Sequence, residues 1–222
     1  MSPLKTWAAA ALSLTVAATA HAALINRGGG MIYDTTQNLA WLADFNYAFT
    51  SGYAAAHGVP IYPTVDPNAV YTHGGMGWAA NLAYGGYEDW RLPGLNPSDT
   101  SCSNDRDLGG AFGVQHDGTG CTGGELSHLF VLDLGNQAWQ SVLNTDGDSA
   151  EQIANQALFT NLNLDSFWSG TAFPPDPTLA WYFYARTGAQ LNHDTRTGYF
   201  AIAVREGDVA AVAEPQTLGL VT

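Results

Sequence analysis

Lysine is almost absent from this sequence of 222 residues, and Lys5, near the N-terminus, is the only one. Lysine and arginine together number 7 against 20 acidic residues, which gives a formal net charge of −13. Proteins that bind nucleic acids, polyanionic glycans or anionic membrane surfaces need clustered positive charge. The composition therefore argues against nucleic-acid partners and against lasting contact with an anionic membrane.

Apolar runs long enough to cross a bilayer are also missing after the first 22 residues. Those residues carry Lys5, an alanine-rich apolar run over 7–20, and the small-x-small end Ala20-His21-Ala22. A charged start, a short apolar middle and such an end define a secretory signal peptide. We expect signal peptidase to remove residues 1–22, so that roughly 200 residues remain, enough for one secreted or cell-envelope domain.

Cysteine is scarce too, because Cys102 and Cys121 are the only two. They lack C-x-x-C spacing, and no cluster of further ligands lies near them in the sequence, which argues against a redox or zinc motif. In an oxidising compartment an isolated pair most simply forms a disulfide. It would close a loop rich in Gly, Asp, Ser and Thr and stabilise it by roughly 3 kcal/mol.

The remaining pattern indicates short elements joined by long loops. Turn residues at 34–38 separate two apolar runs, so 31–42 is predicted to form a β-hairpin. Helices are expected at 77–84, before two glycines, and from Glu125, which has capping-box spacing with Thr122. In the last third, 167–170 reads as a short strand. Runs at 180–185, 190–192 and 199–205 predict a three-stranded antiparallel meander.

Several of these segments together resemble the Lcl C-terminal-domain family, a domain of unknown function. The resemblance rests on Asp34-Thr35 followed by Leu39-Ala40-Trp41, on 85–93, which ends in Trp90-Arg91-Leu92-Pro93, on the helix from Glu125, and on Trp168-Ser169, Ala180-Trp181-Tyr182 and 199–205. It spans about residues 28–206. It implies an α+β fold like that of C-type lectins, with two short helices, small twisted antiparallel sheets and long loops.

The C-terminus carries a second resemblance, to PEP-CTERM sorting signals. Val212-Ala213-Glu214-Pro215-Gln216-Thr217 is similar to their Val-Pro-Glu-Pro-x-Thr box, with Glu214, Pro215 and Thr217 as the matching residues. In that family the box precedes an apolar helix and an arginine cluster, and an exosortase processes it. Together with the signal peptide at 1–22 and the domain expected at 23–206, this resemblance makes 207–222 a linker with a partial sorting signal.

One loop offers oxygen ligands in a pattern that calcium sites use. The candidate ligands are Asn144, Asp146, Asp148 and Glu151, although Ser149 stands where an EF-hand requires glycine. The alternative is a solvated polar loop. Glu125 and His128, three apart on a predicted helix, could also face one metal or substrate, but Glu125 is equally suited to capping that helix.

Aromatic side chains are the candidates for ligand binding. Their rings pack against the C–H faces of sugars while their polar tips donate hydrogen bonds. Because alternate residues of a strand face opposite ways, only part of such a set can be exposed. Arg91 is expected to hold a loop through its five donors, between the core residues Trp90 and Leu92. The candidate binding residues are Trp168, Trp181, Tyr182 and Tyr184.

These observations favour an exported envelope or extracellular-matrix protein that binds a polysaccharide or matrix component without catalysis. No cofactor is required by any motif, and calcium is the one ion that the pattern suggests. The sulfated ligands associated with the adhesin that names the family fit poorly, since only arginines remain after residue 22. The alternative is a secreted hydrolase with two carboxylates in a loop-lined cleft, for which paired carboxylates with displaced pKa values would be the sign.

Overall fold

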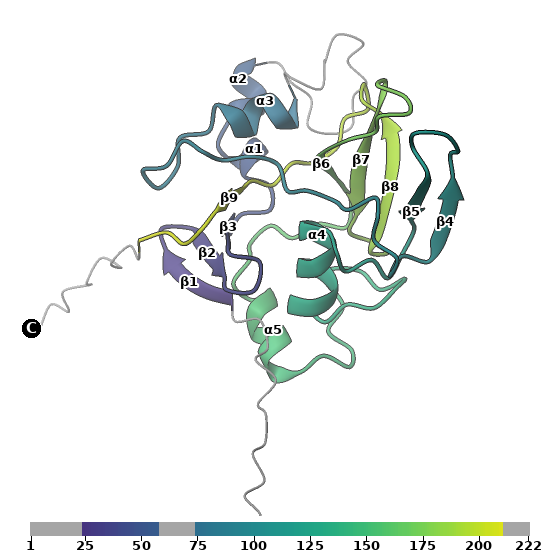
Figure 1. The fold of residues 1–222 in the computed structure, drawn as a ribbon. Helices are drawn as coiled ribbons and strands as arrows, with labels where there is room; N and C mark the ends of the chain where they lie inside the picture. Colours follow the sequence, from purple (N-terminus) through teal and green to yellow (C-terminus); the bar gives the residue numbers. More distant parts are fainter. Residues whose placement is uncertain (1–23, 58–73, 211–222) are drawn as a thin grey trace, which may run out of the picture.

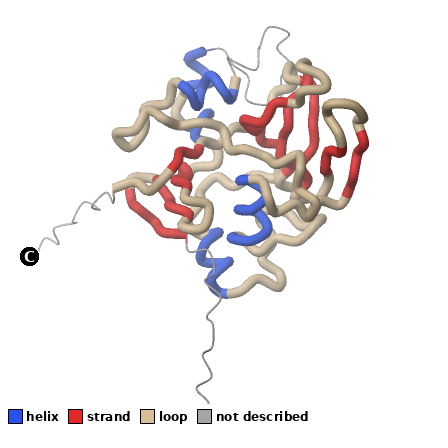
Figure 2. The backbone as a smooth tube through the Cα atoms, viewed as in Figure 1, coloured by secondary structure: helices blue, strands red, loops and turns tan. Residues whose placement is uncertain are grey.

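The computed structural model describes residues 24–57 and 74–210. In these ranges the chain forms three small antiparallel sheets, short helices and long connecting loops (Figures 1 and 2). The α+β class is therefore confirmed. The helices exceed the two that were expected, since α1 (Tyr47–Thr50), α2 (Tyr53–His57) and α5 (Ala150–Gln156) are helical as well.

The first sheet joins the two ends of the described chain. Its order is β1-β2-β3-β9, so the last strand pairs with β3, where Trp41 lies opposite Val204. The predicted hairpin is confirmed, with Met31 opposite Leu42 and Asp34 opposite Leu39. The strands are β1 Leu24–Gly28, β2 Met31–Asp34, β3 Leu39–Leu42 and β9 Val204–Glu206.

The second sheet is the C-terminal meander, but its strands differ from those predicted. The segment 166–172 supplies the first strand, and the segment 199–205 supplies none. The latter runs beside β6, where Trp168 N donates to Phe200 O, and then crosses to the first sheet as β9. Residues 201–204 are consequently buried, whereas Tyr199 and Phe200 are only partly buried. The meander strands are β6 Ser166–Ala172, β7 Leu179–Tyr184 and β8 Ala189–Asp194.

The third sheet is a hairpin of β4 (Asn104–Asp107) and β5 (Val114–Asp117), which Figure 1 shows beside the meander. It is held there by Gln190, a fully buried residue of β8. The backbones of Gly118 and Gln190 exchange hydrogen bonds of 2.9 and 2.8 Å. The Gln190 side chain also donates to Asn96 O and His116 O. One side chain thus fixes the hairpin to the meander.

The helices are short, and two differ from the sequence expectation. The expected helix at 77–84 is α3, which ends at Ala80, because Tyr84 and Tyr87 form a tight turn around Gly85-Gly86 instead. Both glycines have positive φ, as such a hairpin turn requires. The loop with the candidate calcium ligands leads directly into α5, a helix that was not predicted and that Ser149 and Gln152 cap reciprocally. The other helices are α1 Tyr47–Thr50, α2 Tyr53–His57, α3 Gly75–Ala80, α4 Glu125–His128 and α5 Ala150–Gln156.

Helix α4 begins at Glu125 as predicted, but its N-cap is Gly124 rather than Thr122. It then continues as the π-helical segment η1 (Leu129–Asp133), closed by the bond from Leu134 N to Leu129 O. Leu126, Leu129 and Phe130 pack into the main core between the sheets. Most tryptophans also serve the core, and Trp139, 77% exposed, is the exception among those the structure describes.

Candidate functional site

The four predicted binding aromatics divide between the two faces of the meander. Trp181 is fully buried and Trp168 is 5% exposed, so neither can line an open platform. Tyr182 and Tyr184 are half-buried and lie on the opposite face of β7 from Trp181. The residues to examine for binding are therefore the tyrosines, with Trp168 as the floor beneath them.

Further rings complete this surface. The Tyr199 ring packs at a tilt against Tyr182, with 4.8 Å between centroids and 45° between planes, and against Trp168, with 4.7 Å and 42°. His193, which lies opposite Ala180 in the register and is exposed, is 5.7 Å from Tyr199. We call Tyr182, Tyr184, His193 and Tyr199 the aromatic face. The sequence did not identify Tyr199 and His193 as binding candidates. Residues 199–205 were predicted to form a strand of the meander, and the predicted strand 190–192 ended before His193.

Hydrogen bonds hold the aromatic face in position. Thr197 accepts from the Trp168 indole at 3.2 Å through its carbonyl, and its hydroxyl lies 2.9 Å from His193 Nδ1. The Tyr182 hydroxyl bonds that of Tyr199. Burial, followed by the neighbouring tyrosine, raises the pKa of Tyr182, and burial also raises the pKa of Tyr199. Both phenols are therefore neutral at physiological pH, able to donate and to accept.

The polar loop that was a calcium candidate does not gather its carboxylates. Asn144 Oδ1 accepts from the Asp146 backbone at 2.8 Å, which is the geometry of an Asx turn. Glu151 lies in the first turn of α5. Among the described residues, Asp146, Asp148 and Glu151 are not one of the groups whose ligand atoms approach within 4.8 Å. Asp148 Oδ2 is buried without a hydrogen-bond partner among the described residues, so calcium binding by this loop stays a prediction.

The Trp90-Arg91-Leu92-Pro93 motif has the structural arrangement that was expected of it. Trp90 and Leu92 are buried. Arg91 donates to both carboxylate oxygens of Glu125 at 2.7 Å, and it also bonds Glu206. Pro93 O accepts from Gly170 N at 2.9 Å. The motif thus ties together α4, β6 and β9, and the donors of Arg91 point to protein partners.

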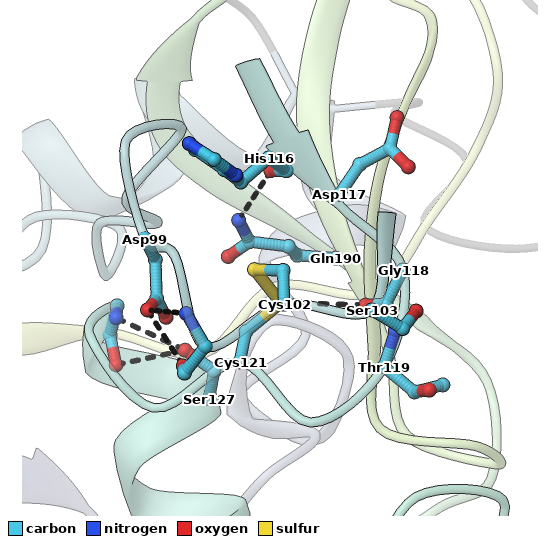
Figure 3. The surroundings of a disulfide bond; sticks show 12 residues. Asp99, Cys102, Ser103, His116, Asp117, Gly118, Thr119, Cys121, Ser127 and Gln190 are labelled. Atoms are coloured by element: carbon cyan, nitrogen blue, oxygen red, sulfur yellow. Dashed lines mark hydrogen bonds between the residues drawn. A yellow bond between two sulfur atoms is a disulfide. The ribbon is translucent and has the colours of Figure 1, made fainter. Parts of the chain in front are cut away.

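The disulfide between Cys102 and Cys121 is present, as predicted. Figure 3 shows it next to the Gln190 side chain that holds the neighbouring hairpin, with Asp99 to one side. Asp99 is buried, and its carboxylate accepts from the backbone of Ser101, Thr122 and Gly123. Because both sulfurs are bonded to one another, the proximity of Asp99 to the cysteines is a feature of the loop and gives no metal-binding thiolate.

Glu125 and His128 do not share a site. Glu125 binds Arg91 and Gly94 N, whereas His128 turns toward two buried aspartates, Asp34 and Asp133. One ligand atom of each of these three residues lies within 4.8 Å of the others. We call Asp34, His128 and Asp133 the buried acidic cluster. The sequence analysis had treated Asp34 as turn chemistry and had not singled out Asp133.

The electrostatics of this cluster are unusual. Asp133 is 1% exposed, and burial, followed by the charge of Asp34 and a hydrogen bond with it, raises its pKa to about 8. Burial also lowers the pKa of His128, against smaller opposing contributions from Asp34 and the Thr122 backbone. Two carboxyl groups and a neutral imidazole therefore face one another away from water.

No family model, curated protein or solved structure matches this chain. The predicted signal peptide at 1–22 and the sorting residues Glu214, Pro215 and Thr217 lie outside the described residues. In the part of the chain that the structure describes, no helix combines the length and apolarity needed to cross a membrane.

Proposed function

We propose that this chain is an exported cell-envelope or extracellular-matrix protein that binds a glycan through its aromatic face. The observation that carries the proposal is the cluster of tilted rings on one side of the meander, in which Tyr199 contacts Trp168, Tyr182 and His193. Sugar rings present flat C–H faces edged by hydroxyls. Half-exposed aromatic rings with free hydrogen-bonding capacity match both features.

The charge of the chain narrows the class of glycan. With a formal net charge of −13, the protein would repel sulfated or uronic polymers at long range. Near the aromatic face, Arg196 is paired with Asp194, and Arg186, two residues after Tyr184, is one exposed arginine rather than the cluster of positive charge that polyanions require. Neutral or amino-sugar polysaccharides are therefore the expected ligands.

Export and attachment are proposed from sequence features near the two termini. The leader, the disulfide and the similarity to PEP-CTERM signals together support passage out of the cytoplasm and handling by signal peptidase and an exosortase. The resemblance to the Lcl C-terminal-domain family supports a C-type-lectin-like arrangement, in which loops and short strands present the ligand surface.

The hydrolase alternative finds its paired carboxylates but lacks the open cleft. Asp34 and Asp133 are 0% and 1% exposed, so a substrate cannot reach them from solvent in this structure. An open pocket of about 300 Å³ lies elsewhere, beside Trp90 and Thr171, and no Asp or Glu lines it. Among the described residues, the paired carboxylates are buried and the open pocket lacks carboxylates, which favours binding over hydrolysis.

A glycan array tests the proposal directly. The oxidised chain without residues 1–22 should bind neutral or amino-sugar polymers with or without calcium. Tyr199→Ala and Tyr182→Ala should each weaken binding about fivefold or more, since stacking against one ring contributes about 1 kcal/mol or more. Trp139→Ala is the matched control, because that ring is exposed far more but lies outside the aromatic face. Equal losses for Trp139→Ala and Tyr199→Ala, or no glycan signal, would refute the proposal.

A further inference from the structure

The buried acidic cluster combines residues from two places in the fold. Asp34 ends β2, and His128 and Asp133 lie at the two ends of the turn in which α4 becomes η1. The turn after β2 lies against α4, where Gln37 Nε2 donates to Glu125 O at 3.3 Å. Figure 1 shows α4 at the centre of the molecule, beside the first sheet. A ligand bound at the cluster would therefore join the hairpin to the central helix.

The π-helical winding is what brings His128 and Asp133 together. On an α-helix, residues five apart point roughly 140° away from one another. A π-helix closes its hydrogen bonds over five residues, so that such residues lie nearly on the same side. His128 Nε2 is consequently 3.9 Å from Asp133 Oδ1. π-Helical turns occur frequently at functional sites, and here the turn creates a pair of facing ligand atoms.

The cluster presents acceptors but few donors. Neither oxygen of Asp133 accepts a hydrogen bond from an N–H or hydroxyl group of the described residues, and His128 Nε2 is likewise without a partner there. The other ring nitrogen of His128 bonds the Thr122 backbone, which leaves Nε2 as a lone pair directed to the cluster. A single proton shared between Asp34 and Asp133 makes one hydrogen bond and leaves His128 Nε2 without a partner. A cation can satisfy all three.

Asp34 is held ready by its own turn. Its Oδ1 accepts from the backbone N–H groups of Thr36 and Gln37 at 2.9 and 3.0 Å, and its Oδ2 accepts from Gln37 Nε2 at 2.8 Å. Hydrogen bonds of this kind orient a metal-binding carboxylate in characterised sites. Further oxygen lone pairs remain for a ligand, since a carboxylate offers about four acceptor positions.

We propose that Asp34, His128 and Asp133 bind one divalent transition-metal ion, with zinc as the best fit. One imidazole and two carboxylates suit zinc and its first-row neighbours, whereas calcium and magnesium take oxygen ligands only. His128, whose side chain is 17% exposed against 0% for Asp133, marks the side from which the ion enters. The ion would clamp the β2–β3 turn onto α4, independently of the aromatic face.

Zinc binding is measured by titration against a chromophoric chelator, using the oxidised, tag-free chain without residues 1–22, first treated with EDTA. The wild-type protein should bind one equivalent, and its melting temperature should rise when zinc is restored. Asp133→Asn and His128→Gln should each weaken binding at least tenfold. His116→Gln is the matched control, because His116 pairs with Asp105 on the β4–β5 hairpin, outside the cluster.

Cobalt supplies a second readout that does not depend on stability. Visible absorption bands should appear on one equivalent of Co²⁺ with the wild-type and His116→Gln proteins and disappear with His128→Gln. If Asp133→Asn fails to fold, the His128→Gln titration decides the matter, since that side chain is partly exposed. Absence of stoichiometric zinc binding, or unchanged affinity in His128→Gln, would show that the cluster holds only a shared proton and would overturn the proposal.

Discussion

The junction between Arg91 and Glu125 offers a direct test of how the loops are held. Glu125→Ala removes two hydrogen bonds of 2.7 Å to Arg91 and one of 2.6 Å to Gly94 N. Breaking a buried ion pair costs about 3–5 kcal/mol, whereas an exposed pair contributes about 0–1 kcal/mol. The side chains of Arg91 and Glu125 are 38% and 23% exposed, between these limits. We therefore expect a loss of about 2–3 kcal/mol.

Urea denaturation followed by tryptophan fluorescence measures this loss, because five of the described tryptophans are buried: Trp41, Trp78, Trp90, Trp168 and Trp181. In a domain of this size the melting temperature should fall by about 4–12 °C. Glu206→Gln is the control, since Glu206 bonds the same guanidinium from a side chain that is 69% exposed, and it should cost less than about 1 kcal/mol. Equal effects of Glu125→Ala and Glu206→Gln would refute a central role for the junction.

Two further predictions concern the disulfide loop. Replacement of Cys102 and Cys121 by alanine, or their reduction, should lower the free energy of unfolding by about 3 kcal/mol, as measured by urea denaturation. The reason is that the disulfide no longer closes a loop between cysteines 19 residues apart and so no longer restricts the unfolded chain. Asp99→Asn should destabilise the protein at pH 6. Burial raises the pKa of Asp99, but hydrogen bonds from Ser101, Gly123 and Thr122 outweigh it and lower the pKa overall. The stability from that shift exists above the unfolded-state pKa and is lost as the pH falls through the lower folded-state pKa. The difference between wild type and Asp99→Asn in pH-dependent melting should therefore shrink below about pH 4, and a constant difference would contradict this account.

Local features of the fold were predictable where adjacent residues determine them. The 31–42 hairpin has turn residues between two apolar runs, and the helix at Glu125 begins where an acidic residue precedes a helical apolar pattern. The disulfide followed from there being only two cysteines. Even the helix at 150–156 had a local signal, since Ser149 and Gln152 have capping-box spacing.

The pairing of strands that are distant in the sequence was harder to predict. Residues 199–205 show the alternation of a strand, but nothing in that alternation tells whether the partner is the neighbouring meander or a strand formed 160 residues earlier. The aromatic candidates show the same limit. Period-two alternation indicates that Trp181 and Tyr182 face opposite ways, yet the choice of the buried face depends on the core that α4 and β3 supply.

The buried acidic cluster depends on a feature that helical periodicity conceals. At 3.6 residues per turn, His128 belongs with Glu125 and away from Asp133, which is why the i, i+3 pair was the natural metal candidate. One π-helical turn reverses this grouping, while Arg91 removes Glu125 by pairing with it. The same turn leaves Asp133 facing Asp34 with no donor of the described residues to neutralise it. An arrangement that is costly for folding alone has a physical reason to persist if the chain binds a cation there, because the ion converts three opposing acceptors into a cross-link between hairpin and helix.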